Sequence, residues 1–112
     1  MAHEAFVIML DGPPWLEEVL RNQHFHVVHR YHKTSLPVFV LGGATAIDVA
    51  RKTPNLHGVI LWNAHGVPST DLTVPLLLIN SDPIEALDVT RVPGDDEKLF
   101  AKLAARFISV HS

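Results

Sequence analysis

Short continuous apolar runs alternate with stretches of helical periodicity along the whole chain. Such runs are typical of strands buried on both faces, which occur in parallel sheets covered by helices. Each run ends at a turn signal, for example Asp11-Gly12-Pro13-Pro14 after the first run and Gly42-Gly43 after the third. The predicted strands comprise residues 6–10, 25–31, 37–41, 59–62, 75–79 and, as the weakest of them, 86–92.

Three stretches between these runs have apolar residues at helical spacing. The first follows Pro14, which suits a first helical turn, and the second covers residues 44–52 and ends before Pro54. The third opens at residues 94–97, where acidic side chains oppose the positive end of the helix dipole. The alternation predicts a single α/β domain over residues 1–112, with three layers and a mostly parallel sheet of about six strands. We therefore expect any ligand site outside the carboxyl ends of the strands.

The composition excludes several classes of protein. The chain of 112 residues contains no cysteine, which excludes disulfides, zinc–thiolate sites and a thiol nucleophile. Its formal net charge is −3 with neutral histidines, so it lacks the basic field of a nucleic-acid-binding protein. The apolar runs are too short to span a membrane, and residues 1–5 show no signal-peptide pattern, so we expect a cytoplasmic protein.

The most informative stretch is a strand, a tight turn of small residues and a helix, with the turn Gly42-Gly43-Ala44-Thr45-Ala46. It resembles the nucleophile elbow of the α/β-hydrolase family, where the pattern Gly-x-Ser-x-Gly joins a central strand to its helix. In this chain alanine stands at the serine position, Ala44, and the last glycine is also replaced by alanine.

The resemblance extends over most of the chain. Asp82, after the fifth apolar run, matches the acidic member of the family's triad. Asp11-Gly12 stands where His-Gly is common, and residues 95–97 are acidic where the family places its histidine. The chain is shorter than family members, without room for their first two strands or a lid. If the family's strand order holds, the strand at 25–31 becomes an edge.

These departures change the expected chemistry. A serine hydrolase needs a nucleophile, a base and an acid, and Ala44 has no nucleophilic atom. Backbone N–H groups after Gly12 and at Thr45 are expected to hold a carbonyl oxygen. The resemblance therefore implies a protein that binds or transforms a small carbonyl, ester or thioester-like compound, by chemistry other than ordinary hydrolysis. The candidate acid–base residues are Asp11, His65 and Asp82, and the candidate substrate-binding residues are Gly12, Gly43, Thr45 and Asn63.

The same residues also fit simpler roles and different functions. Asn63 to Gly66 is typical of a plain turn, and Asp82 before Pro83 of a capping residue. Another hypothesis is that the chain is a variant of a small esterase or thioesterase in which alanine replaces the catalytic serine at position 44. A non-catalytic binding or dimerisation module is a second functional hypothesis. A third is an unrelated flavodoxin-like or receiver-like domain in which Asp11 is the acidic group.

Four histidines lie close together in the sequence, at positions 24, 26, 29 and 32. On a strand, His24, His26 and His32 share one face, and two histidines so spaced are able to bind zinc or copper. No further ligands are indicated by the spacing, so we expect a polar edge strand, no metal and no cofactor. Such an edge could instead pair with a second copy and form a homodimer.

Overall fold

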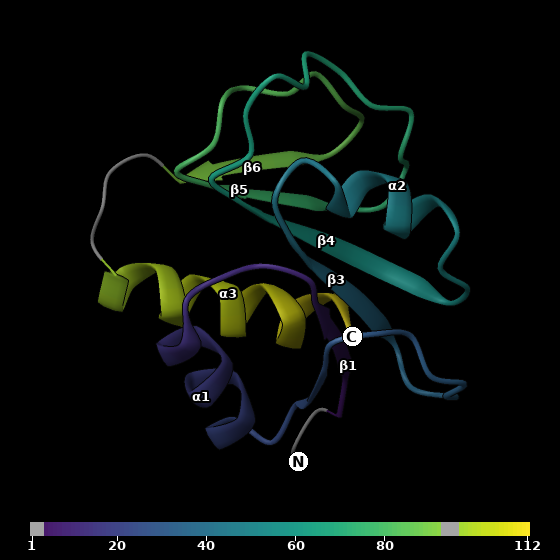
Figure 1. Ribbon diagram of the computed structural model, residues 1–112, viewed down its shortest axis with the longest axis vertical. Helices are drawn as coiled ribbons and strands as arrows, with labels where there is room; N and C mark the ends of the chain where they lie inside the picture. Colours follow the sequence, from purple (N-terminus) through teal and green to yellow (C-terminus); the bar gives the residue numbers. More distant parts are fainter. Residues whose placement is uncertain (1–3, 93–96) are drawn as a thin grey trace.

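The computed structural model describes residues 4–92 and 97–112. Within these ranges six parallel strands form one sheet, in the order β2-β1-β3-β4-β5-β6, and three helices cover its two faces (Figure 1). The predicted three-layer α/β fold with a parallel sheet is therefore confirmed. The elements are β1 (Phe6–Met9), α1 (Pro14–Asn22), β2 (His26–Val28), β3 (Val38–Gly42), α2 (Ala46–Arg51), β4 (Leu56–Trp62), β5 (Leu76–Ile79), β6 (Val89–Val92) and α3 (Glu97–His111).

Alternate residues of each strand contribute to two separate apolar cores. In β1, Val7 and Met9 belong to the core under α1 and α3, whereas Phe6 and Ile8 belong to the core under α2. Because successive strand side chains point to opposite faces, a continuous apolar run supplies both cores at once. The helices complete the cores with Leu16, Leu20, Phe100, Ala104, Phe107 and Ile108 on one side and Ala46, Ile47 and Ala50 on the other.

The edge strand β2 is shorter than its sequence pattern predicts. It ends at Val28, because the next residue leaves the ladder and its imidazole Nδ1 lies 3.2 Å from the Met9 carbonyl oxygen. The side chain of His29 thus contacts the backbone carbonyl oxygen of Met9, at the end of β1. The expectation of one long histidine-bearing strand over 25–31 is wrong in length, although β2 does lie at the edge of the sheet.

Other boundaries also differ from the predictions, and β6 begins only at Val89 rather than at residue 86. β4 begins at Leu56 rather than at residue 59, because Gly58 leaves room for the ring of Phe107 and so interrupts the apolar run without ending the strand. The helix predicted over 44–52 is α2, which begins only at Ala46. Ala44 and Thr45 form the preceding turn, in which the Ala46 N–H donates to the Gly43 carbonyl oxygen at 3.0 Å. The predicted helix opening at 94–96 lies outside the described residues.

The strand order is compatible with two of the fold hypotheses. An edge position for β2 is what the α/β-hydrolase order predicts. The order β2-β1-β3-β4-β5 is also that of flavodoxin-like sheets, whose ligands bind where the order reverses, between β1 and β3. The topology therefore directs attention to the carboxyl edge without choosing between these folds. Among the described residues, no helix is long and apolar enough to cross a membrane.

Candidate functional site

Two neighbouring strands bring together the strongest acid–base pair at the carboxyl edge of the sheet. His65 follows β4 and Asp82 follows β5, and the imidazole Nδ1 lies 3.1 Å from the carboxylate Oδ1. The residues are 17 apart in sequence, and the parallel pairing of β4 with β5 places their loops side by side. The structure thus joins two of the three predicted acid–base residues.

Backbone and hydroxyl hydrogen bonds fix these two loops against each other. The Asp82 N–H donates to the Ala64 carbonyl oxygen at 2.9 Å, and the Ala64 N–H donates to the Ser81 Oγ at 2.9 Å. Ser81 is only 6% exposed, and its hydroxyl donates to the Ile79 carbonyl oxygen at 3.0 Å. The sequence places Ser81 on this rim together with Asp82, but it does not reveal the structural role of the Ser81 hydroxyl.

Two asparagines turn the chain at the ends of the same strands. Asn63 and Asn80 have φ values of 51° and 47°, in the left-handed region that asparagine tolerates better than most residues. Their side-chain amide groups lie 2.6 Å apart. Asn63, predicted to bind substrate, is therefore occupied in holding its loop, which favours a structural role.

The His65 imidazole lowers the pKa of Asp82 below its ordinary value of 3.8. The hydrogen bond from His65 is the largest cause; desolvation opposes it, while the charge of His65, the Gly66 backbone N–H and Arg91 lower the pKa further. An ionised Asp82 favours the tautomer with the proton on Nδ1, which leaves Nε2 as a free acceptor. The two side chains are 61% and 57% exposed, so the pair faces solvent rather than a closed pocket.

Asp11, Gly12 and Gly43 form a second group, at the carboxyl ends of β1 and β3. The Gly12 N–H donates to the Asp11 Oδ1 at 2.9 Å, and a Cβ on Gly43 would lie 3.9 Å from the Asp11 Oδ2. The expectation that a backbone N–H after Gly12 holds a carbonyl oxygen is wrong. Residues 13 and 14 are both proline and have no N–H, and the Gly12 N–H is already bonded to Asp11.

A cavity of about 380 Å³ adjoins this second group, within the size range of ligand pockets. Glu17 of α1 and His29 contact each other in its lining, with the Glu17 Oε1 2.9 Å from the His29 Nε2. Nothing in the sequence pattern pairs them, because they come from a helix face and from the end of an edge strand. The lining residues are Met9, Leu10, Asp11, Gly12, Pro14, Glu17 and His29.

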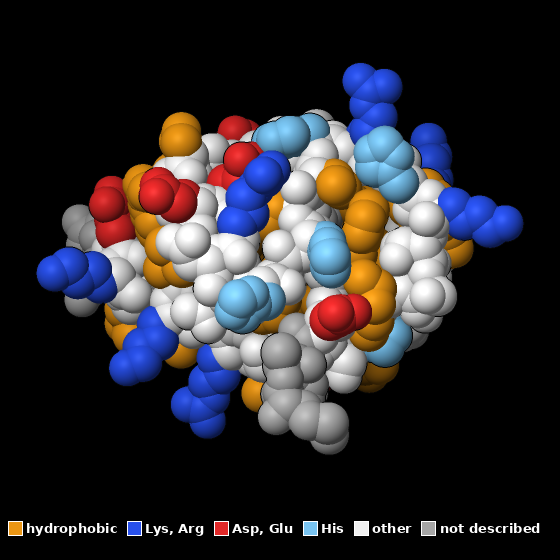
Figure 2. Space-filling view, turned by 90° about the horizontal axis from the view of Figure 1, so that it is seen from below, with side chains coloured by type: hydrophobic (Ala, Val, Ile, Leu, Met, Phe, Trp, Pro, Cys, Tyr) orange, Lys and Arg blue, Asp and Glu red, His pale blue; other side chains and the backbone are white. Residues whose placement is uncertain are grey.

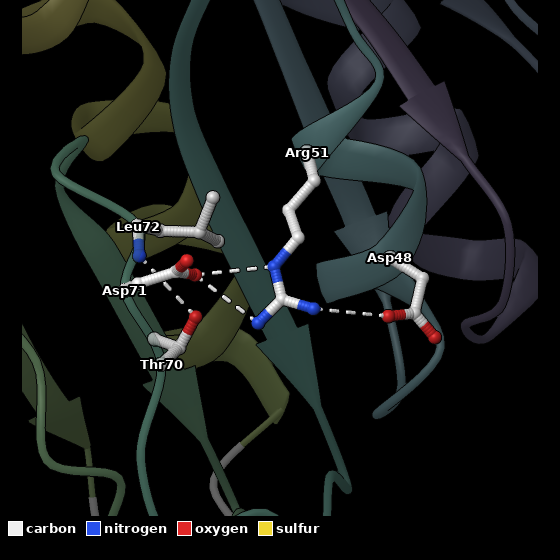
Figure 3. Close-up of polar contacts among 5 residues, drawn as sticks. All are labelled: Asp48, Arg51, Thr70, Asp71 and Leu72. Carbon is white, nitrogen blue, oxygen red and sulfur yellow. Dashed lines mark hydrogen bonds and ion pairs between the residues drawn. The ribbon is translucent and has the colours of Figure 1, made fainter.

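Ala44 and Thr45 line a third location, a hollow of about 270 Å³ beside α2. Val67 and Ser69 form its opposite side, while Arg51 ties that side to α2 (Figure 3). The Arg51 guanidinium lies 3.1 Å from the Asp71 Oδ1 and 3.4 Å from the Asp48 Oδ1. The turn at the nucleophile position thus adjoins a small hollow, and none of the predicted acid–base residues is in its lining.

The histidines within residues 4–92 and 97–112 do not gather into a metal site. Figure 2 shows histidine side chains spread separately over the face seen from below. His29 faces Glu17, His32 packs edge-on against the Phe6 ring, and His57 Nδ1 lies 2.8 Å from the His111 carbonyl oxygen. In the described part of the chain, no three histidine or acidic side chains are placed to hold a metal ion together.

Comparisons with protein-family models, with curated proteins and with solved structures found no match for this chain. The fold and the geometry at its carboxyl edge therefore define a small α/β protein with a parallel sheet, a solvent-facing His–Asp pair and a separate cavity at the end of β1, beside α1 and His29.

Proposed function

We propose that this chain binds a small carbonyl, ester or thioester-like compound at the carboxyl edge of its sheet and transfers a proton on it. The observation that carries the proposal is the His65–Asp82 pair, whose Nδ1 and Oδ1 atoms are 3.1 Å apart. A carboxylate that orients an imidazole through Nδ1 leaves Nε2 to act as a general base. The hydrogen bonds of Ser81 and of the Asp82 N–H link the two loops that carry the pair.

The chemistry proposed is proton transfer without a covalent intermediate. Ala44 supplies no nucleophile, so the elbow-like turn has no side chain at this position to form an acyl-enzyme. A proton beside a carbonyl group passes to Nε2 of His65, and the resulting imidazolium is stabilised by the carboxylate of Asp82. The proton then returns to the same compound at another atom, which is an isomerisation. In an elimination it passes instead to the departing group as the bond to that group breaks, so these are the two reaction classes to test.

Descent from the α/β-hydrolase family is part of this proposal. The elbow-like turn at 42–46, the acidic residue Asp82 after β5 and the edge position of β2 support it. Two features favour a rebuilt site over a conserved one. No N–H donor follows Gly12 at positions 13 and 14, and the hollow beside Ala44 contains none of the candidate acid–base residues.

Exchange of carbon-bound hydrogen for deuterium tests the proposal directly. Small ketones, esters and thioesters are incubated in D₂O with the wild-type chain, and loss of the proton signal beside the carbonyl is followed by NMR. We expect His65→Gln to slow exchange by about 100-fold or more and Asp82→Asn by about tenfold. His26→Gln is the matched control, because His26 is also exposed but lies on β2.

Exchange that is no faster than in buffer, or equal rates in all three variants, would contradict the proposal. The exposure of the pair, 61% and 57%, favours the second candidate function, a binding or dimerisation module without turnover. Binding of one of the compounds without exchange would support that candidate instead. So would a dimer seen in light scattering that dissociates when a proline is placed in the edge strand β2.

A further inference from the structure

A groove runs between α1 and α3, on the outer side of the two-helix layer. Its volume is about 540 Å³, larger than that of the cavity beside Asp11. The side chains that line it are Val19 of α1, Gln23 directly after α1, and Lys98, Ala101, Lys102, Ala105, Arg106 and Ser109 of α3. This groove lies away from the carboxyl-edge residues considered above, so the proposed function does not use it.

The charge of the groove is opposite to that of the molecule. Lys98, Lys102 and Arg106 follow one another at four-residue spacing along α3, and none of the residues described as lining the groove is acidic. The whole chain carries a formal net charge of −3. Like charges four residues apart repel one another along a helix, so the mutual spacing of these cations does not itself stabilise α3.

The floor of the groove is formed by small or branched apolar side chains. Ala101 is 7% exposed, and Ala105 and Val19 are partly buried against the core. Ala101 and Ala105 are one helical turn apart, which permits close approach of another backbone. The groove thus combines an apolar floor with one cationic wall.

We propose that this groove docks an amphipathic helix of a partner protein, whose acidic side chains meet Lys98, Lys102 and Arg106. A helix laid between two helices is a common mode of recognition, with apolar anchors in the groove and charges at its margin. The charge complementarity selects an acidic segment over a basic or neutral one.

An anionic membrane is the competing ligand for a cationic helix. Membrane-bound helices insert apolar side chains that project from a convex face. In this chain the apolar atoms beside the cations are recessed between α1 and α3. The exposed apolar residues of α3, Leu99 and Val110, are not among the lining residues. The geometry favours a helix over a bilayer.

Fluorescence anisotropy with a labelled helical peptide tests the docking site. The probe is a peptide of about 20 residues with glutamate at every fourth position beside alanine and leucine, and its matched control carries glutamine at those positions. We expect the acidic peptide to bind at least tenfold more tightly than the glutamine peptide. Lys102→Glu combined with Arg106→Glu should weaken binding about tenfold or more.

Lys33→Glu combined with Lys52→Glu is the matched control variant, because both lysines are exposed outside the groove. It should change affinity less than twofold, and circular dichroism confirms that both double variants are folded. NMR shifts on adding the peptide should concentrate at Val19, Ala101 and Ala105. The proposal is overturned if the acidic peptide fails to bind, if both double variants lose binding equally, or if phosphatidylserine vesicles displace the peptide from the groove.

Discussion

Gly58 is a glycine whose replacement the structure predicts to disrupt the packing of the core. It lies in the middle of β4, between the two aromatic rings that cover it. A Cβ at this position would lie 2.9 Å from the Phe107 Cε1 and 3.0 Å from the Phe39 Cε2. The two rings pack against each other edge to face at 6.0 Å, and Phe39 is fully buried, so neither ring can move alone.

The magnitude for Gly58→Ala follows from two opposing effects. Overpacking of a core costs about 1–3 kcal/mol, and loss of glycine's freedom in the unfolded chain returns about 0.4–1 kcal/mol. The central values give a net loss of about 1.3 kcal/mol in the free energy of unfolding. A chain of 112 residues has an unfolding entropy of about 0.24 kcal/mol/K, so the melting temperature should fall by about 5 °C.

Gly43→Ala is the matched control, since its Cβ would lie 3.8 Å from the Trp62 carbonyl oxygen, at ordinary contact distance. With the unfolded-state effect alone, its melting temperature should rise by about 2–4 °C. Both variants are compared with the wild-type chain by thermal denaturation followed by circular dichroism. A Gly58→Ala variant that melts at or above the wild-type temperature would refute the argument that the two rings require glycine at this position.

Three other measurements address the site and its surroundings. In His65→Gln, the pKa of Asp82 should return toward 3.8, as NMR titration of its carboxyl carbon measures; an unchanged pKa would contradict the pairing. Because this pKa is lowered by folding, the stability that Asp82 contributes is present above 3.8 and is lost as the pH falls through the lower folded value. Ala44→Ser should leave ester and thioester hydrolysis at background, because the hollow lined by Ala44 does not include His65, and an acyl-enzyme burst would disprove this. Arg51→Met should lower the free energy of unfolding by about 0.5–1 kcal/mol in low salt. Its melting temperature should equal that of the wild-type chain in about 1 M salt, and a difference that persists there would show a role other than the ion pairs with Asp71 and Asp48.

The fold was predictable because its signals are local and repeated. A single continuous apolar run such as residues 75–79 fits either a strand or a buried helix. The alternation of several such runs with helical stretches, however, predicts a parallel sheet. Boundaries were less predictable where a distant residue decides them. The start of β4 depends on Phe107 fitting over Gly58, and the end of β2 depends on His29 reaching the Met9 carbonyl oxygen.

The candidate site was predictable in part for the same reason. His65 and Asp82 could be expected near each other, because the loops after parallel strands lie at one edge. The sequence could not show that Asp11 and Ala44 line different hollows, since that depends on the path of residues 63–75 across α2. The pairing of Glu17 with His29 was equally hidden, because it joins elements whose spacing along the chain carries no signal.

The two faces of the sheet are covered unequally, and this affects how the molecule fluctuates. One face lies under α1 and α3, of 9 and 15 residues, whereas the other lies under the 6-residue α2 and loops. A helix of under two turns has little stability of its own and depends on its packing and on Arg51. Amide hydrogens of α2 should therefore exchange through local opening, while those of β3 and β4 exchange only when the whole domain unfolds. The elbow-like turn at Ala44 leads into this less stable helix, so local opening of α2 should release the rim beside it while the rest of the sheet stays intact.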